Sequence, residues 1–220
     1  MPARKPPALC VFDLDGTLID SLRDIANAVN ASLALFGRTP WPLEAVQTMV
    51  GEGVPVLCRR AMPDAPESDV QRLIELTRGR YRAFAMEHTR PYLGIKEMVQ
   101  RLAATGAKLG VLTNKPHGIS CRIVRALWPN GEFAQVEGYV REAARKPNAG
   151  TLLRMAETAG VSIGETVLIG DTPTDVKTAA NAGSRVLAVT WGFRGRAELE
   201  AAGAREFVDR PEEIPAALGY

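Results

Sequence analysis

The chain has 220 residues, of which 46% are hydrophobic and 24% charged, and its formal net charge is +2 at pH 7. This composition is typical of a folded protein with a sizeable core, either one domain with an insertion or two domains. The small net charge argues against nucleic acid or a membrane surface as a partner. No stretch approaches the ~20 apolar residues of a membrane span, and residues 9–12 are too short for a signal-peptide core.

The first predicted element is a buried strand over residues 8–13, which leads into the sequence Asp13-Leu14-Asp15-Gly16-Thr17. On a regular strand, Asp13 and Asp15 point to the same side, where two like charges repel unless a cation offsets them. A hard divalent ion with oxygen ligands, above all Mg²⁺, would do so. Taken alone, the motif fits a strand followed by an ordinary polar turn equally well.

The next part of the chain predicts a helical insertion. Between Ser21 and Tyr92 there is no convincing strand, and the stretch is longer than a crossover connection needs. Asp20 and Ser21 are typical of the N-cap of a helix, and further helical patterns follow Pro42, Gly53 and Pro66. We therefore expect residues 20–91 to form an all-helical domain inserted after the first strand.

Strands and helices alternate through the rest of the chain. Strand-like runs occupy residues 107–113, 134–140, 166–170, 185–190 and 206–208, and helical patterns occupy residues 95–105, 117–127, 148–160 and 173–183. Such alternation predicts a parallel sheet covered by helices on both faces. The expected fold class is α/β: a doubly wound, Rossmann-like parallel sheet formed by residues 1–19 and 92–220, with the all-helical domain inserted.

Polar groups follow three more of these strands: the run Thr113-Asn114-Lys115, Lys146, and the segment from Gly170 to Asp175. The carboxyl ends of parallel strands meet in one crevice, so these groups should converge with Asp13 and Asp15. Asp171 and Asp175, four residues apart on a helix face, would repel as a plain surface pair, which favours a metal site. Lys146 could be an ordinary loop lysine, and Thr17 and Thr113 ordinary turn residues.

This order of motifs resembles the haloacid dehalogenase-like hydrolase superfamily over nearly the whole chain. Its four motifs match here as DxDGT from Asp13, threonine at Thr113, lysine at Lys146 and GDxxxD from Gly170 to Asp175. In that family, a helical insertion at this position is a mobile cap over the active site. The resemblance also implies that the metal contacts the backbone carbonyl of the second aspartate, so that the carboxyl group of Asp15 stays free.

The chemistry of phosphate-ester hydrolysis gives these residues roles. Asp13 is the candidate nucleophile and Asp15 the candidate general acid and base. Thr113 would donate a hydroxyl hydrogen to phosphate oxygens, and Lys146 would offset negative charge. The predicted Mg²⁺ ligands are Asp13, Asp15 through its carbonyl, Asp171 and Asp175, the last directly or through water.

The remaining candidates bind substrate. Gly16 suits a tight turn near the phosphate, Thr17 offers a hydroxyl and Asn114 a backbone amide. In the insertion, Arg59 or Arg60 could reach a substrate carboxylate, although two solvated surface arginines are an equally good interpretation. They are adjacent on a predicted helix, so we expect only one to face inward.

Within the superfamily, five segments look most like the phosphoglycolate phosphatase branch with a helical cap: residues 18–21, 50–53, 90–92, 113–116 and 192–193. This resemblance implies a Mg²⁺-dependent phosphatase that acts on a small phosphorylated metabolite through an aspartyl-phosphate, with 2-phosphoglycolate as the best candidate. The alternatives are a phosphosugar mutase, which shares DxDG, and a non-enzymatic aspartate phosphoacceptor switch. A dehalogenase is disfavoured because Asp15 is present, and a phosphonate hydrolase because no lysine lies between Asp20 and Ile95.

The cysteines and histidines give no sign of a metal site. Cys10, Cys58 and Cys121 are odd in number and fit no metal-binding spacing, and His88 and His117 do not either. We interpret the cysteines as reduced thiols of a cytoplasmic protein, which we expect to be a monomer or homodimer without nucleic-acid or membrane partners.

Overall fold

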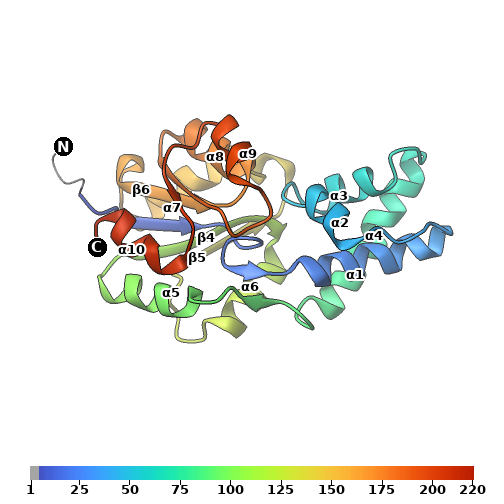
Figure 1. Ribbon diagram of the computed structural model, residues 1–220, viewed down its shortest axis with the longest axis horizontal. Coiled ribbons are helices and arrows are strands. Elements are labelled where there is room, and N and C mark those ends of the chain that lie inside the picture. Colours follow the sequence, from blue (N-terminus) through green and yellow to red (C-terminus); the bar gives the residue numbers. More distant parts are fainter. Residues whose placement is uncertain (1–4) are drawn as a thin grey trace.

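The computed structural model describes residues 5–220 and contains a parallel sheet of six strands in the order β5-β4-β1-β6-β7-β8 (Figure 1). The strands are β1 (Leu9–Phe12), β4 (Lys108–Pro116), β5 (Gln135–Tyr139), β6 (Thr166–Gly170), β7 (Arg185–Val189) and β8 (Phe207–Val208). Every pairing between neighbours is parallel, and the chain adds strands first on one side of β1 and then on the other. The predicted doubly wound α/β fold is confirmed.

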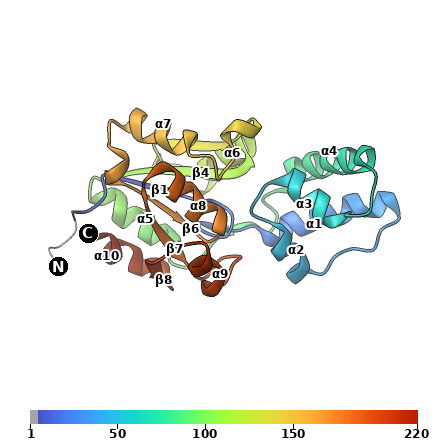
Figure 2. The same ribbon diagram turned by 90° about the horizontal axis from the view of Figure 1, so that it is seen from above.

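Helices cover both faces of the sheet (Figures 1 and 2). Their bounds are α5 (Ile95–Ala104), α6 (His117–Leu127), α7 (Gly150–Ala159), α8 (Pro173–Ala182), α9 (Arg196–Ala201) and α10 (Ile214–Leu218). Alternate residues of β1 serve the two faces: Cys10 and Phe12 share a buried cluster with α5, α6 and α10, and Leu9 and Val11 share one with α7 and α8. Because β1 is buried on both sides, its sequence is a continuous apolar run.

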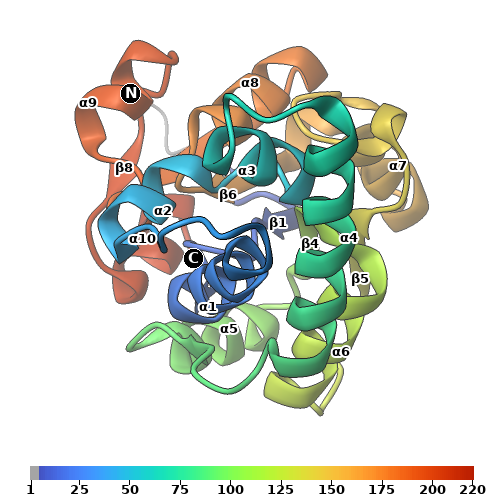
Figure 3. The same cartoon turned by 90° about the vertical axis from the view of Figure 1, so that its right-hand side faces the viewer.

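The predicted helical insertion consists of α1 (Leu22–Leu33), α2 (Leu43–Met49), α3 (Val54–Ala61) and α4 (Glu67–Phe84). These helices pack on one another beyond the carboxyl end of the sheet, and Figure 3 looks over them towards β1, β4 and β6. Short 3-10 helices complete the described elements: η1 (Ala34–Phe36), η2 (Glu142–Ala144), η3 (Ile163–Glu165) and η4 (Pro211–Glu213). No helix in residues 5–220 is long and apolar enough to cross a membrane.

The prediction that no strand lies between Ser21 and Tyr92 was wrong. The two connections between the insertion and the sheet pair as short antiparallel strands, β2 (Ile19–Asp20) and β3 (Arg90–Pro91). Two residues are too few to show the alternation that identifies a strand in a sequence. The pair holds the start and end of the insertion side by side, so the insertion joins the sheet through a narrow, hydrogen-bonded neck.

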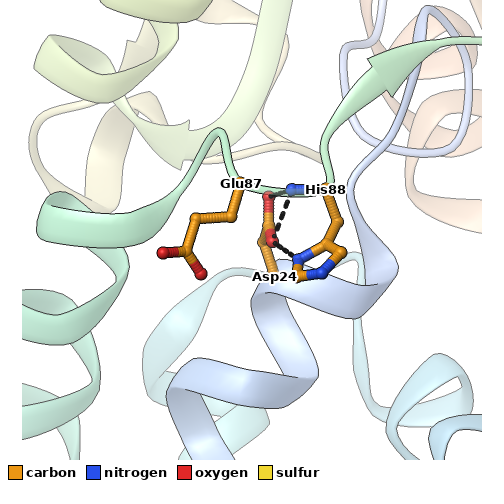
Figure 4. A group of neighbouring side chains, drawn as sticks. All are labelled: Asp24, Glu87 and His88. Atoms are coloured by element: carbon orange, nitrogen blue, oxygen red, sulfur yellow. Dashed lines mark hydrogen bonds and ion pairs between the residues drawn. The ribbon is translucent and has the colours of Figure 1, made fainter.

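A buried carboxylate reinforces this neck. Asp24 on α1 accepts hydrogen bonds from the backbone amide of His88, at 3.0 and 3.1 Å to its two oxygens, and contacts His88 Nδ1 at 2.8 Å (Figure 4). It also accepts hydrogen bonds from the backbone amide of Thr89 (2.8 Å) and from the Thr89 hydroxyl (2.7 Å). Burial alone would raise the pKa of Asp24, but the hydrogen bonds from Thr89 and His88 outweigh it and lower the pKa. Glu87 lies close enough to complete a possible metal-binding group. Since four donors already occupy the Asp24 oxygens, we interpret this group as structural.

We predict that Asp24→Ala destabilises the protein by about 2–3 kcal/mol at neutral pH, because it leaves buried donors of His88 and Thr89 without an acceptor. The pKa of Asp24 is lower in the folded chain than the ~3.9 of an unfolded one, so its contribution is present above that value and is lost as the pH falls through the folded pKa. Urea unfolding should therefore give a difference in the free energy of unfolding between variant and wild type that is constant from about pH 7 to pH 5 and becomes smaller towards pH 3. Glu75→Ala, which removes an exposed carboxylate of α4, is the control. A gap that does not change with pH would contradict this account.

Candidate active site

The predicted catalytic groups meet at the carboxyl end of the sheet. Asp13 directly follows β1, Asp171 directly follows β6, and Lys146 lies in the connection between η2 and α7. Lys146 Nζ is 2.9 Å from Asp13 Oδ1 and 2.6 Å from Asp175 Oδ1. The structure thus brings together residues that are up to 162 positions apart in the sequence.

Lys146 is buried, with 2% of its surface exposed. Burial lowers the pKa of its ammonium group, but the charges of Asp13 and Asp175 outweigh this and raise it, so Lys146 stays charged. Asn114 fixes its backbone: Asn114 Oδ1 accepts the Lys146 amide at 2.8 Å, and Asn114 Nδ2 donates to the carbonyls of Lys146 and Gly51, each at 3.2 Å. The sequence predicted only a backbone role for Asn114, whereas its side chain positions the lysine and contacts the insertion.

Asp171 is held from two sides. Thr17 Oγ1 donates to Asp171 Oδ1 at 2.7 Å, and the Phe193 amide donates to Asp171 Oδ2 at 2.8 Å. The carboxylate fits only because two neighbours are glycines: a Cβ on Gly16 would lie 2.2 Å from Asp171 Oδ2, and one on Gly192 would lie 2.3 Å from Asp171 Cβ. Thr17 was predicted to donate to phosphate, but here its one hydroxyl hydrogen is used on Asp171.

Asp175 occupies the first turn of α8, where Thr172 donates to Asp175 Oδ2 through its amide (3.1 Å) and its hydroxyl (2.7 Å). The expectation that Asp171 and Asp175 share a helix face was wrong, because α8 begins at Pro173 and Asp171 precedes it. A tight turn brings them together instead, with no room for a Cβ on Gly170, which would lie 2.4 Å from Asp175 Cγ.

This cluster suits a hard cation. Ligand atoms of Asp13, Asp171 and Asp175 all lie within 4.8 Å of one another, and all three residues are buried. Burial raises the pKa of Asp13, even with Lys146 beside it, and burial together with the Asp13 and Asp175 charges raises the pKa of Asp171. The carboxylates therefore carry uncompensated repulsion that a divalent ion would relieve. Carboxylate oxygens are the ligands that Mg²⁺ prefers, at about 2.1 Å.

Asp15 forms a second, separate network. Its Oδ1 accepts from Ser21 Oγ at 2.5 Å and from Lys115 Nζ at 2.6 Å, and Lys115 also donates to the hydroxyl of Tyr81 on α4. Asp20 and Ser21 were predicted at the N-cap of α1. Ser21 occupies that position without a side-chain capping bond, and Asp20 accepts the Leu22 amide at 3.2 Å. Lys115 was expected at this edge of the sheet but was given no role, and Tyr81 was missed. A lysine at the end of a buried strand was the available signal for Lys115, whereas nothing distinguished Tyr81 from other helical core residues.

Between the sheet and the insertion lies a cavity of about 50 Å³. The insertion contributes an apolar wall of Ile25, Val50, Val54 and Leu57, and the sheet contributes polar groups that include Asp13, Asp15, Thr113 and Lys115. Thr113 Oγ1 accepts the Lys115 amide at 3.3 Å, and its hydroxyl hydrogen has no acceptor within residues 5–220. A small molecule in this cavity would contact both acids of the DxDGT motif.

Neither arginine proposed for the substrate carboxylate lines this cavity. Arg59 pairs with Glu67 on α4 at 2.5 Å. Arg60 pairs with Glu52 and donates to the Met49 carbonyl at 3.1 Å. The expectation that one of them turns inward is not met, because acidic partners beside α3 hold both.

The loop after β7 connects the insertion to the acidic cluster. Arg194 donates to the carbonyls of Gln47 (2.7 Å), Thr48 (2.9 Å) and Val50 (2.7 Å). These carbonyls lie at the end of α2, where the helix itself offers them no amide donor. The neighbouring residue, Phe193, donates its amide to Asp171. No sequence pattern indicated this contribution, because it is made by a backbone group.

The chain is similar to known proteins over most of its length. A family model described as haloacid dehalogenase-like hydrolase matches residues 10–189. The phosphoglycolate phosphatase of Agrobacterium fabrum is 32% identical over 197 residues, covering 88% of this chain and 84% of that protein. The phosphoglycolate phosphatase of Pseudomonas syringae pv. tomato is 33% identical over 225 residues, covering 98% and 82%. The solved structure of a proposed phosphoglycolate phosphatase from Lactobacillus delbrueckii subsp. bulgaricus has a TM-score of 0.92 at 28% identity, covering 98% of this chain and all of that one.

We predict that Gly192→Ala weakens binding of a divalent cation by about 10- to 100-fold, because the added Cβ displaces Asp171 from its donors. Titration calorimetry with Mg²⁺ or Mn²⁺ measures this. Gly195→Ala is the matched control in the same loop: its φ is −76° and nothing lies within 4 Å of the added Cβ. Equal affinities in the two variants would show that crowding at Gly192 does not position Asp171.

Proposed function

Because this chain belongs to the haloacid dehalogenase-like hydrolases and is a phosphoric monoester hydrolase, we propose that it hydrolyses a small phosphate monoester in a Mg²⁺-dependent reaction. The best candidate substrate is 2-phosphoglycolate, the substrate named in its curated relatives. The observation that carries the proposal is the position of Asp13, a buried carboxylate between Lys146 and the cavity. We expect such an enzyme in the cytoplasm, where its free thiols would stay reduced.

In the proposed reaction, a carboxylate oxygen of Asp13 attacks phosphorus and the bond from phosphorus to the ester oxygen breaks. Asp15 gives its proton to the departing oxygen. Asp15 then takes a proton from a water molecule that attacks the phosphorus of the aspartyl-phosphate, which frees Asp13 and releases inorganic phosphate. Lys146 offsets negative charge at Asp13 throughout, and Thr113 has a free hydroxyl hydrogen for a phosphoryl oxygen.

The cation would be held by Asp13, the Asp15 carbonyl and Asp171, with Asp175 helping directly or through water. When bound, Mg²⁺ supplies positive charge that neutralises the phosphoryl oxygens. In this scheme Thr17 positions Asp171 by donating a hydrogen bond to it, and Gly16 leaves the space that the Asp171 carboxylate occupies. Asn114 positions Lys146 by accepting its backbone amide.

We further propose that residues 20–91 act as a cap over a core formed by residues 1–19 and 92–220, of which residues 1–4 lie outside the described chain. The cap supplies the apolar wall of the cavity, and the catalytic acids come from the core. A closed cap excludes water from the site, which strengthens the electrostatic interactions within it. Substrate choice would then depend on groups that line the closed cavity.

The metal requirement is directly testable. We expect an excess of chelator to abolish activity, Mg²⁺ to restore it, and Ca²⁺ to inhibit, because Ca²⁺ takes a larger and looser coordination that misplaces Asp13. Phosphate release from nitrophenyl phosphate is a sufficient assay. Full activity in excess chelator would rule out the proposed cation.

The intermediate is tested by Asp15→Asn, which keeps the backbone carbonyl but removes the acid and base. General acid–base catalysis contributes roughly 10²–10⁴-fold. Because nitrophenolate leaves with little protonation, Asp13 should still attack nitrophenyl phosphate, whereas breakdown of the aspartyl-phosphate should become slow. We expect a burst of nitrophenol that equals the enzyme concentration, followed by very slow further release. We also expect phosphate on Asp13 that is stable in acid and labile in alkali.

The control is Asp64→Asn, which alters an exposed carboxylate paired with Arg38 and should keep a linear time course. A linear rate for Asp15→Asn without labelled protein would instead favour direct attack by water and remove Asp13 as nucleophile.

A further inference from the structure

Lys115 stands out among the residues that line the cavity. It is the only cationic side chain in that lining within residues 5–220. Its side chain is 2% exposed, so its charge is almost wholly removed from water. A buried ammonium group is costly unless anions and acceptors surround it, so its presence here needs an explanation beyond packing.

The hydrogen bonds of Lys115 leave one donor available. Its Nζ is 2.6 Å from Asp15 Oδ1, donates to the Tyr81 hydroxyl and lies 4.4 Å from the centre of the Tyr81 ring. An ammonium group has three hydrogens, and these two acceptors use two of them. The third has no acceptor in the described chain, and Lys115 lines the cavity. A second anion could therefore reach this group from the cavity side.

The distance from the reaction centre limits what that anion can be. Thr113 and Lys115 both line the cavity and are two residues apart, so their backbones are separated by at most about 7 Å. A phosphoryl group between Asp13 and Thr113 would place the far end of a two- or three-carbon chain beside Lys115. The apolar side chains on the opposite wall offer no alternative partner for a charge.

We propose that Lys115 is the specificity-determining residue and that its free hydrogen binds a carboxylate carried by the substrate. This inference rests on the proposed phosphatase function and narrows its substrate class to compact phosphate monoesters with a second anionic group. On binding, the substrate carboxylate accepts the third hydrogen of Lys115. Asp15 keeps its bonds to Ser21 and Lys115 through Oδ1, and its Oδ2 is available for the ester oxygen. A neutral ester leaves the third hydrogen of Lys115 without an acceptor.

This assignment replaces the arginines considered from the sequence. Arg59 and Arg60 keep their pairs with Glu67 and Glu52 and lie outside the cavity lining. Recognition of charge would thus come from the core.

The test compares 2-phosphoglycolate with ethyl phosphate, which has the same chain length and no carboxylate. Wild type and Lys115→Met are assayed for kcat and KM on both esters, with Lys96→Met, an exposed lysine of α5, as the control for lost charge. We expect Lys115→Met to lower kcat/KM for 2-phosphoglycolate by about 10- to 100-fold, the range for a charge-assisted hydrogen bond, mainly through KM. The KM for ethyl phosphate should change by less than about threefold, and Lys115→Arg should recover part of the preference.

Equal losses on the two esters would overturn the proposal, since Lys115 would then act only through Asp15, and so would no loss on either. If Lys115→Met does not fold, wild type alone decides: 3-phosphonopropionate, which keeps the carboxylate, should inhibit nitrophenyl phosphate hydrolysis about 10-fold better than propylphosphonate. Equal inhibition by the two compounds would also overturn it. Absence of Mg²⁺-dependent turnover of every ester by wild type would instead refute the proposed function itself.

Discussion

Two buried ammonium groups hold the site together against the repulsion of its carboxylates. Lys146 bridges Asp13 and Asp175, and Lys115 pairs with Asp15. Asp171 has no lysine partner and depends on a hydroxyl and a backbone amide. The acids outnumber the lysines, so the site keeps a negative excess that the surrounding backbone must hold in place. Much of the local structure, from the glycines to the turn before α8, follows from that requirement.

The glycines show how the backbone meets this requirement. At Gly16, Gly170 and Gly192 a Cβ would lie 2.2 to 2.4 Å from an aspartate atom, so each position must lack a side chain for the carboxylates to converge. Gly16 also has a φ of +87°, which other residues rarely adopt. Close packing of main chain around an acid lets amide dipoles stabilise charge without extra side chains. The cluster is therefore positioned by strand ends and tight turns.

The sequence was most informative where burial and function leave patterns in consecutive residues. Buried parallel strands are apolar runs, and the polar residues that end them meet at one edge, so Asp13, Thr113 and Asp171 could be predicted to converge. Contacts that depend on packing between distant elements left no such pattern. The amide of Phe193 is invisible in a sequence, and the pairing of Lys115 with Asp15 requires the relative placement of β1 and β4. Likewise, whether Arg59 turns inward depends on Glu67, which lies on the next helix.

The contacts of Arg194 have a mechanical consequence. Its guanidinium group holds three carbonyls at the end of α2, and the adjacent peptide orients Asp171. A swing of α2 away from the sheet would strip those carbonyls of their donor and pull on the same loop that supports the acid. Access to the cavity and the alignment of Asp171 would then change together, because both depend on the loop of Phe193 and Arg194. An open protein of this design would be a poor catalyst at the very moment when water can enter.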